Sequence, residues 1–512
     1  MGLPEAYGVP TDVSWECFWH LNELLRKTLG IGQREGSGMK TTLRIALCTG
    51  VLFASTLCLS RCEAWGEVSF DTDGMLLVNG ERFFPVGIYE LPEGDELKEI
   101  ADAGFNLARA SADAGSLDRA ASVGLKSWIP LGGNMDVRDD AALEKLAGIV
   151  ERFKDHPALL VWEGPDEPLW NVWYSTHGWM YGGQIAAFKD RIKAVREGNA
   201  ASDADKLFEE YRAALGVADY GSAESAVAKL WEVLGEQPPR PTVLMSTAPE
   251  RAKALADGLY AGYAAIRKTD PAHPVWLNHA PRNTIPDLAY FNRAAQIVGC
   301  DIYPVPYQTT GHSDLVNKRL SCVGDYTVRM QAAAPGKAVW MVLQGFGWRD
   351  LREEKPEDET QGRRPSYDET RFMAFDAIVH GADGLLYWGT HYIDKPSRFW
   401  TDLKRVVGEL AGLQDVLAAR TLDIDLRVEL KPTLNSADRG IVAVAKRARG
   451  KTFIIAVNEF QEPLGCTLSG VPVADGARLR DTQKGSVLTV NGGEVSCFLG
   501  GCGVAVLEEQ RF

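Results

Sequence analysis

Three carboxylic acids stand close together in the segment WEGPDEP, which spans residues 162–168. Glu163, Asp166 and Glu167 are interleaved with two prolines, and these restrict the bend that the backbone can make there. Neighbouring carboxylates resist being ionised together, so one of them can keep its proton near neutral pH and act as a general acid. We take Glu167 as the candidate general acid and Asp166 as its partner. The alternative interpretation is an exposed acidic turn, because turns favour Asp and Pro.

Polar and aromatic residues also end other apolar runs of the sequence. They are Glu90, Arg109, Asn278, His279, Asp301, Tyr303, Gln344, Tyr387 and Trp388. Each has a structural explanation when taken alone: Arg109 could pair with a carboxylate, and His279 or Trp388 could belong to a core. If the runs are parallel strands of a barrel, however, all these side chains lie at one rim, where barrel enzymes have their active sites. Their joint occurrence favours that second interpretation.

The elements that would position these residues are eight short apolar runs, each followed by a polar loop and usually by a helical pattern. The runs are residues 83–90, 105–110, 125–131, 158–164, 274–280, 296–304, 338–345 and 384–390. Gly104 stands where a helix would end, and Ser366 with Glu369 forms a capping-box pattern. Apolar strands that alternate with helices predict a (β/α)8 TIM barrel of the α/β class. The alternative is a doubly wound open sheet, but no Gly-rich phosphate loop follows the first run.

The chain is longer than a minimal barrel needs, and two segments account for the difference. Two Ala/Glu/Lys-rich helical patterns after the fourth run predict a helical insertion at about residues 170–247, since a structureless loop of that length is uncommon. Short alternating strands separated by Gly, Asn and Asp predict a small all-β sandwich over residues 417–512. The barrel domain would then span residues 65–416.

The first 64 residues precede the predicted barrel and contain a pattern typical of export. In residues 39–64 two basic residues precede an apolar stretch that ends in small residues, which is the layout of a secretory signal peptide. The stretch is short for a membrane span, and an anchored protein with a short cytoplasmic tail is the alternative. We expect residues 1–38 to be an upstream extension ahead of the true start at Met39. The mature protein would be secreted or periplasmic and have no stable membrane span.

Composition narrows the choice of partners. The 55 Lys and Arg against 69 Asp and Glu give a net charge of −14, which argues against nucleic-acid binding because phosphate contacts need clustered basic residues. The 14 Trp, 15 Tyr and 18 Phe suit a carbohydrate substrate, since flat rings stack on sugar faces. The cysteines after Ala64 lack metal-binding spacing, so we expect neither a metal nor an organic cofactor. Two of Cys466, Cys497 and Cys502 could pair in an exported chain, and nothing in the sequence indicates the oligomeric state.

The segment 67–415 resembles the clan A glycoside hydrolases, and the residues at the strand ends carry the resemblance. In that clan an Arg ends the second strand, an acid/base Glu ends the fourth, a Tyr lies near the sixth, and a Trp on the eighth forms the floor of the sugar subsite. Arg109, Glu167, Tyr303 and Trp388 match these positions. The segment NGERFFPVGIY also resembles the approach to the barrel in the family 2 and family 42 galactosidases. The resemblance implies an enzyme that hydrolyses O-glycosidic bonds of an oligo- or polysaccharide.

Two positions depart from that clan, which has Asn at the place of Asp166 and a nucleophilic Glu at the place of Gln344. An uncharged amide cannot attack an anomeric carbon, so retaining, inverting and substrate-assisted mechanisms all stay open. In substrate-assisted hexosaminidases an Asp before the acid Glu orients the substrate's own acetamido group, and Asp166 resembles that residue. Otherwise a second carboxylate has to come from another segment. The candidates are Glu90, Asp350, Glu353 and Glu354.

Aromatic residues follow both the acidic segment and Gln344. They are Trp170, Trp173, Tyr174, His177, Trp179, Tyr181, Phe346 and Trp348. They predict either a stacking platform for sugar rings or an anchor that holds the insertion on the barrel. In the first case Trp170 and Trp388 would contact sugar faces, and a polar set would hydrogen-bond the hydroxyls. That set is Glu90, Arg109, His279, Asp301, Tyr303 and Gln344.

Two other functions compete with an exported glycoside hydrolase. A glycan-binding protein on a degenerate glycosidase barrel would explain why Gln344 replaces a nucleophile. A different barrel hydrolase could use Asp301 and His279 around a metal ion, since both residue types are common metal ligands. Turnover of glycosides separates the first competitor from the enzyme, and activity in excess chelator separates the second.

Overall fold

The computed structural model describes residues 68–510, apart from 196–198, 308–311, 355–357 and 359. The predicted upstream extension and signal peptide, residues 1–64, therefore lie outside the described residues. In the described part of the chain, no helix has both the length and the apolar character that crossing a membrane requires.

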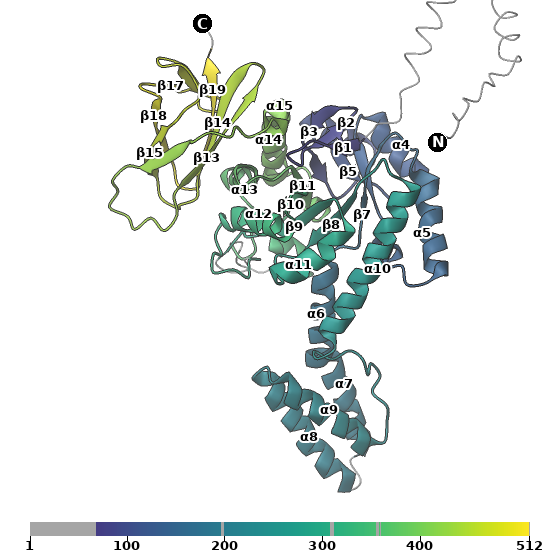
Figure 1. Cartoon of the computed structure of the whole chain (residues 1–512). Coiled ribbons are helices and arrows are strands. Elements are labelled where there is room, and N and C mark those ends of the chain that lie inside the picture. The colour runs from purple at the N-terminus through teal and green to yellow at the C-terminus, as the bar shows by residue number, and fades with distance from the viewer. Residues whose placement is uncertain (1–67, 196–198, 308–311, 355–357, 359, 511–512) are drawn as a thin grey trace, which may run out of the picture. The chain divides into compact units, whose positions relative to one another are not determined.

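Eight parallel strands form a closed barrel, in which the order of neighbours is β10, β11, β4, β5, β6, β7, β8 and β9 (Figure 1). The strands are β4 (Val86–Ile88), β5 (Leu107–Arg109), β6 (Lys126–Pro130), β7 (Leu159–Glu163), β8 (Val275–His279), β9 (Ile297–Ile302), β10 (Ala338–Gln344) and β11 (Gly384–Trp388). Each lies within one of the eight predicted runs, so the TIM barrel is confirmed. The open-sheet alternative is wrong, because β10 pairs with β9 and β11 pairs with β4, which closes the ring.

Large side chains fill the interior of the barrel. Trp128, Trp276 and Trp340 are fully buried, with ring centroids 5.8 Å apart for the first two and 5.9 Å apart for the last two. Every residue of β7, β8 and β10 is buried, because the interior covers one face of these strands and the helices cover the other. The mouth of the barrel lies above this packed core, at the carboxyl ends of the strands.

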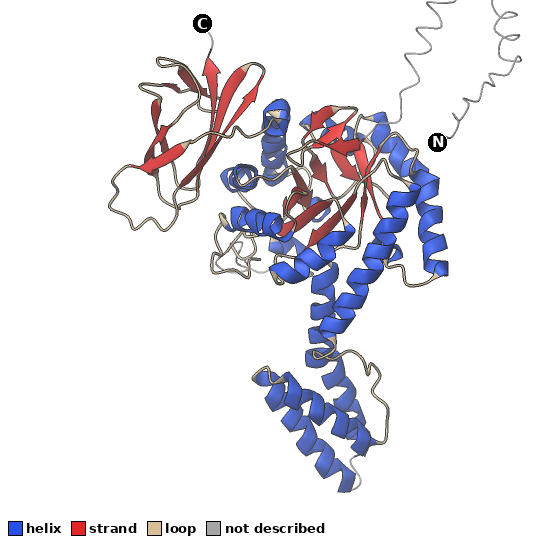
Figure 2. Ribbon diagram, in the orientation of Figure 1, coloured by secondary structure: helices blue, strands red, loops and turns tan. Residues whose placement is uncertain are grey.

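Helices alternate with the barrel strands (Figure 2). They are α3 (Asp95–Ala103), α4 (Ala114–Ser122), α5 (Asp140–Phe153), α10 (Ala248–Thr269), α11 (Ile285–Phe291), α12 (Cys322–Ala333), α13 (Tyr367–Val379), α14 (Arg398–Gly412) and α15 (Gln414–Ala418). Four short 3-10 turns are η1 (Gly132–Met135), η3 (Asn292–Ala294), η4 (Trp348–Leu351) and η5 (Thr390–Tyr392). The local signals agree: Gly104 ends α3 in a left-handed conformation, and Ser366 and Glu369 form the capping box of α13.

Between β7 and α10 the chain forms a helical insertion. Its elements are α6 (Pro168–Gly178), the π-helical turn η2 (Trp179–Gly183), α7 (Gln184–Val195), α8 (Asn199–Gly216) and α9 (Tyr220–Leu234). The insertion has a core of its own, to which Phe188, Tyr211 and Trp231 contribute. Trp179 and Tyr181 pack against this core, so these two aromatic residues hold the insertion together.

A small antiparallel sheet precedes the barrel, and two more follow it. The first consists of β1 (Val68–Phe70), β2 (Leu76–Val78) and β3 (Glu81–Phe83). The C-terminal sheets are β12 (Arg427–Leu430), β15 (Leu464–Ser469) and β18 (Glu494–Leu499), and, in the order of neighbours, β13 (Ile441–Ala448), β14 (Lys451–Asn458), β19 (Val504–Gln510), β16 (Arg478–Asp481) and β17 (Val487–Thr489). The predicted C-terminal sandwich is confirmed.

Strand β14 contributes to two hydrophobic cores at once. Ile454 and Ala456 belong to the core of the sandwich, whereas Phe453, Ile455 and Val457 belong to the same hydrophobic cluster as the barrel. Successive side chains of a strand point to opposite faces, which explains the division. The five-stranded sheet is therefore joined to the barrel through apolar packing.

Candidate active site

Four carboxylic acids meet at the mouth of the barrel. Glu163 is the last residue of β7, Asp166 and Glu167 follow in the turn that leads to α6, and Asp301 lies near the end of β9. Because only β8 separates β7 from β9 in the ring, the two strand ends deliver their acids to one side of the mouth. The predicted acid Glu167 is thus brought together with Asp301, which the sequence suggested as a sugar ligand or, in the alternative hydrolase, as a metal ligand.

The carboxyl groups of Glu167 and Asp301 interact electrostatically at the mouth. Burial raises the pKa of Glu167 to about 7, and the charge of Asp166 adds to the rise, while the interaction with Asp301 and the charge of Arg282 oppose it. The pKa of Asp301 lies well above its ordinary range because it is buried and faces the charges of Glu167 and Asp166. The protonated form of Asp301 is therefore favoured over a wide range of pH.

The backbone of Glu167 has an unusual conformation. Glu167 is the N-cap of α6, with φ 45° and ψ 45°, in the left-handed region that costs a residue other than Gly on the order of 1 kcal/mol. Its N–H donates to the carbonyl of Asn278 at 3.2 Å, and its own carbonyl accepts from the N–H of Asn171 at 2.9 Å. The surrounding turn thus fixes a strained residue, and strain of this kind is concentrated at functional sites.

Glu163 forms an ion pair with Arg109, whose Nε lies 3.1 Å from Glu163 Oε2. The Glu163 side chain is 2% exposed and that of Arg109 is 41% exposed, so the pair runs from the core to the surface of the mouth. Burial raises the pKa of Glu163 to about 7, although the charge of Arg109 lowers it. The Arg109 guanidinium also lies 5.9 Å from the centre of the Tyr89 ring. Glu163 therefore holds Arg109 in position at the rim.

Asp166 is the exposed member of the acidic group. Asn278 Nδ2 donates to Asp166 Oδ1 at 2.9 Å, which fixes the carboxylate beside that of Glu167. Desolvation by the surrounding protein raises the pKa of Asp166, and the hydrogen bond from Asn278 lowers it. At this position Asp166 acts on Glu167 through its charge.

Tyr303 and Trp388 stack on each other at the mouth, with ring centroids 5.6 Å apart and planes 18° apart. The ring of His312 stacks on Tyr303 at 4.9 Å, and Phe346 packs edge-on against both Tyr303 and Trp388. Tyr303 is 6% exposed, whereas Trp388 is partly exposed. Trp388 is therefore partly accessible at the place where the resemblance predicts a sugar floor.

An aromatic groove begins one helical turn after Glu167. It has a volume of about 490 Å³ and is lined by Trp170, Trp173, Tyr174, His177, Tyr220, Met245 and Arg282. The Arg282 guanidinium lies 4.9 Å from the centre of the Trp170 ring, and its charge also lowers the pKa of Glu167. Arg282 thus links the groove to the acid. The first four aromatic residues after Pro168 line a cavity, while the later two belong to the core of the insertion.

Three predicted sugar ligands, His279, Gln344 and Glu90, are bonded to other groups of the protein in the structure. His279 is buried, and its Nε2 lies 2.8 Å from Asn292 Oδ1, because it points to the opposite face of β8 from Asn278. Burial lowers its pKa to about 4. Gln344 accepts from Val305 N at 2.9 Å and donates to the carbonyls of Val305 and Phe346. Its amide is fully engaged in holding the segment that follows β9.

Glu90 holds the segment that follows β11. Its carboxylate accepts hydrogen bonds from Gly389 N at 3.3 Å and Thr390 Oγ1 at 2.6 Å, and it lies 2.7 Å from His391 Nδ1. Asp350, another candidate for the second carboxylate, has a side chain 2% exposed and is bonded by both Arg364 Nε and Nη2, at 2.8 and 2.9 Å. Glu90 and Asp350, which the sequence suggested as candidates for the second catalytic carboxylate, are thus each bonded to neighbouring groups of the protein.

The two remaining candidates, Glu353 and Glu354, are exposed in the loop after η4. Sequence reasoning missed the interaction between the Asp301 and Glu167 side chains. The signal that could have revealed it is a charged residue inside a continuous apolar strand, since such a residue needs a partner when buried.

The described residues contain one group of three side chains that could hold a metal ion, and it lies away from the mouth, at Asp376, His380 and Glu459. Asp301 and His279 do not converge, since His279 faces the helix layer and bonds Asn292. The metal-dependent barrel hydrolase considered from the sequence is not favoured by this geometry.

No family model and no curated protein match this chain. Solved structures with a similar fold include a β-galactosidase from Bacillus circulans sp. alkalophilus, with 11% identity, 84% of this chain and 99% of that chain covered, and a TM-score of 0.46. A glycoside hydrolase family 5 protein from Bacteroides vulgatus has 14% identity, coverage of 87% and 93%, and a TM-score of 0.48. An alpha-amylase from Geobacillus thermoleovorans has 9% identity, coverage of 84% and 100%, and a TM-score of 0.45.

Proposed function

We propose that this protein is a glycoside hydrolase that cleaves O-glycosidic bonds of an oligo- or polysaccharide, with Glu167 as the general acid. The observation that carries the proposal is the group of carboxylic acids at the mouth, in which burial and the charge of a neighbouring acid raise the pKa of both Glu167 and Asp301. A general acid for the leaving oxygen should have a pKa near the working pH, and the pKa of Glu167 is raised to about 7. Asp301 takes the partner role first expected of Asp166.

Each acid then has a definite task. Glu167 gives its proton to the leaving oxygen, and the interaction with Asp301 together with the charge of Arg282 stabilises the carboxylate that remains. Asp166 keeps Glu167 protonated in the resting site by its negative charge. Glu163 holds Arg109 at the rim, where the guanidinium can donate to sugar hydroxyls.

The aromatic groove is the proposed site for the sugar units on one side of the scissile bond. Pyranose rings present apolar faces that stack on Trp and Tyr, and the groove begins beside Glu167. Trp388, partly exposed at the mouth, is the proposed floor for the ring whose bond is cleaved.

The test is the rate of hydrolysis of a panel of aryl glycosides by wild type, Glu167→Gln and Asp301→Asn. Loss of general-acid catalysis costs about 10²–10⁴-fold, but only where the leaving group needs a proton. We therefore expect Glu167→Gln to lose activity on aryl glycosides with basic leaving groups and to keep most of it on activated dinitrophenyl glycosides. Glu209→Gln, at the exposed pair with Arg212, is the matched control and should behave as wild type.

Equal losses on both classes of substrate would refute the role of Glu167. The mechanism follows from two further readouts: the anomer formed first separates inversion from retention, and a strict requirement for a 2-acetamido group identifies substrate assistance.

A glycan-binding protein is the second candidate, and Gln344 favours it, because the amide stands where the resemblance implies a nucleophile. Retained binding of oligosaccharides with no turnover by wild type, on any substrate of the panel, would select it.

We further propose export, on the basis of residues 39–64. N-terminal sequencing of the protein secreted by an expression host would then give a mature chain that begins near Trp65.

A further inference from the structure

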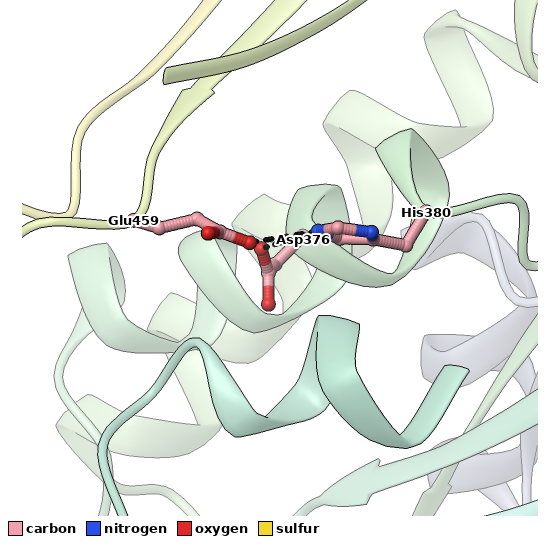
Figure 3. Close-up of side chains that lie close together, drawn as sticks. All are labelled: Asp376, His380 and Glu459. Carbon is pink, nitrogen blue, oxygen red and sulfur yellow. Dashed lines mark hydrogen bonds and ion pairs between the residues drawn. The ribbon is translucent and has the colours of Figure 1, made fainter. Parts of the chain in front are cut away.

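A second cluster of functional side chains lies at the contact between α13 and the C-terminal sandwich (Figure 3). Asp376 and His380 are one turn apart in and just after α13, and Glu459 follows β14. His380 Nε2 lies 2.7 Å from Glu459 Oε1 and 3.9 Å from Asp376 Oδ1, and one ligand atom from each residue lies within 4.8 Å of the others. Figure 3 shows the three side chains pointing toward one another.

Each carboxylate of the cluster has one oxygen fixed from outside. Asp376 Oδ2 accepts from Gly324 N at 2.7 Å, and Glu459 Oε2 lies 3.4 Å from Arg439 Nη1. The other oxygens, Asp376 Oδ1 and Glu459 Oε1, face His380. Bonds of this kind orient the ligands of a metal site and select the atom that binds.

Asp376 Oδ1 has no hydrogen-bond partner, although Asp376 is completely buried. A buried carboxylate oxygen with no partner is costly, and a bound cation removes that cost. His380 Nε2 lies 2.7 Å from Glu459 Oε1 but 3.9 Å from this oxygen, too far for a hydrogen bond. It is therefore an observation that points to a ligand independently of the cluster itself.

Gly324 provides the room that His380 occupies. A Cβ at this position would lie 2.3 Å from His380 Cδ2 and 2.7 Å from its Nε2, so any larger residue would displace the imidazole. The backbone of α12 thus both holds Asp376 and makes space for His380.

We propose that Asp376 Oδ1, His380 Nε2 and Glu459 Oε1 bind one divalent transition-metal ion, which joins α13 of the barrel to the C-terminal sandwich. In a tetrahedral zinc site with bonds of about 2.1 Å, ligand atoms stand about 3.4 Å apart, which falls between the two distances to His380 Nε2. One imidazole and two carboxylates suit Zn²⁺, with water as the fourth ligand. The ion serves stability rather than the chemistry at the mouth.

The experiment uses the full mature chain, stripped with EDTA and dialysed, and Zn²⁺ alone as the probe. We expect isothermal titration to give one Zn²⁺ per chain, and excess Zn²⁺ to raise the midpoint of thermal unfolding by about 2 °C or more. The visible absorption of bound Co²⁺ provides a second readout on wild type. Neither measurement depends on a variant that folds.

His380→Gln and Asp376→Asn keep the size of the side chains and should bind Zn²⁺ at least about a hundredfold more weakly. Glu409→Gln breaks the bond to Arg371, which also donates to the carbonyl of Val504 in the sandwich. This control should lower the unfolding midpoint and keep the response to Zn²⁺.

Zn²⁺ could also be taken up by two cysteines, and a further control addresses them. Cys466 and Cys497 lie side by side in the sandwich, with sulfur atoms 3.1 Å apart, and Cys466→Ser/Cys497→Ser should bind as wild type does. Absence of Zn²⁺ and Co²⁺ binding by wild type would overturn the proposal. So would binding that survives in His380→Gln and Asp376→Asn, or binding that is lost in the cysteine variant.

Discussion

Replacing Asp166 by Asn tests how the mouth sets the protonation of Glu167. The pKa of Glu167 is raised from 4.5 to about 7, first by burial and second by the charge of Asp166. Asn removes that charge and keeps the size of the side chain. Because burial is the larger cause and persists, we expect only part of the elevation to be lost, about a factor of ten in the ionisation constant.

The consequence depends on pH, because a general acid acts only while it is protonated. An acid with a pKa of about 7 is about one quarter protonated at pH 7.5, and an acid ten times stronger is about 3% protonated. We therefore expect kcat/KM of Asp166→Asn to fall by about eightfold at pH 7.5 and by less than about twofold at pH 5. The basic limb of the profile moves to lower pH.

The assay is the pH profile of kcat/KM on an aryl glycoside, with Asp166→Glu as the matched control. This control keeps the negative charge, and its basic limb should stay with that of wild type. A loss by the same factor at every pH in Asp166→Asn would refute the reasoning. Asp166 would then act by positioning, through its bond to Asn278, and its charge would not set the pKa of Glu167.

Three further predictions follow from other contacts. Since burial raises the pKa of Glu163 to about 7, the folded state favours its protonated form, and stability should fall as the pH rises from about 4.5 to 7. Glu163→Gln should flatten this dependence in thermal unfolding and also lower activity, because Arg109 loses its partner. Trp170→Ala should raise KM for long oligosaccharides more than for aryl monosaccharides, and equal effects would exclude the groove. Oxidised glutathione should remove two free thiols, those of Cys466 and Cys497, which pair in register on β15 and β18.

The barrel could be predicted from the sequence because its strands are buried on both faces. Such strands appear as continuous apolar runs, and all eight runs contain a barrel strand. The ring order follows from the alternation with helices, so Arg109, Glu167, Asp301 and Trp388 could be placed near one rim. The C-terminal sandwich showed the alternating pattern of antiparallel strands.

The direction of each strand-end side chain could not be predicted to the same degree. Asn278 and His279 are adjacent, yet Asn278 bonds Asp166 at the mouth and His279 bonds Asn292 beneath a helix. A shift of one residue reverses the face, and an apolar run that is buried on both faces carries no sign of which residue points inward. The same ambiguity hid the interaction between Asp301 and Glu167.

The role of Gln344 connects the fold to the chemistry. The Gln344 Oε1 atom accepts a hydrogen bond from Val305 N, and Nε2 donates to the carbonyls of Val305 and Phe346. The side chain therefore needs both an acceptor and a donor. An ionised carboxylate has no proton to donate, and at this fully buried position it would leave both carbonyls without that partner. An amide is therefore what this packing requires. The amide at the end of β10 thus fits the way in which the neighbouring segment is held.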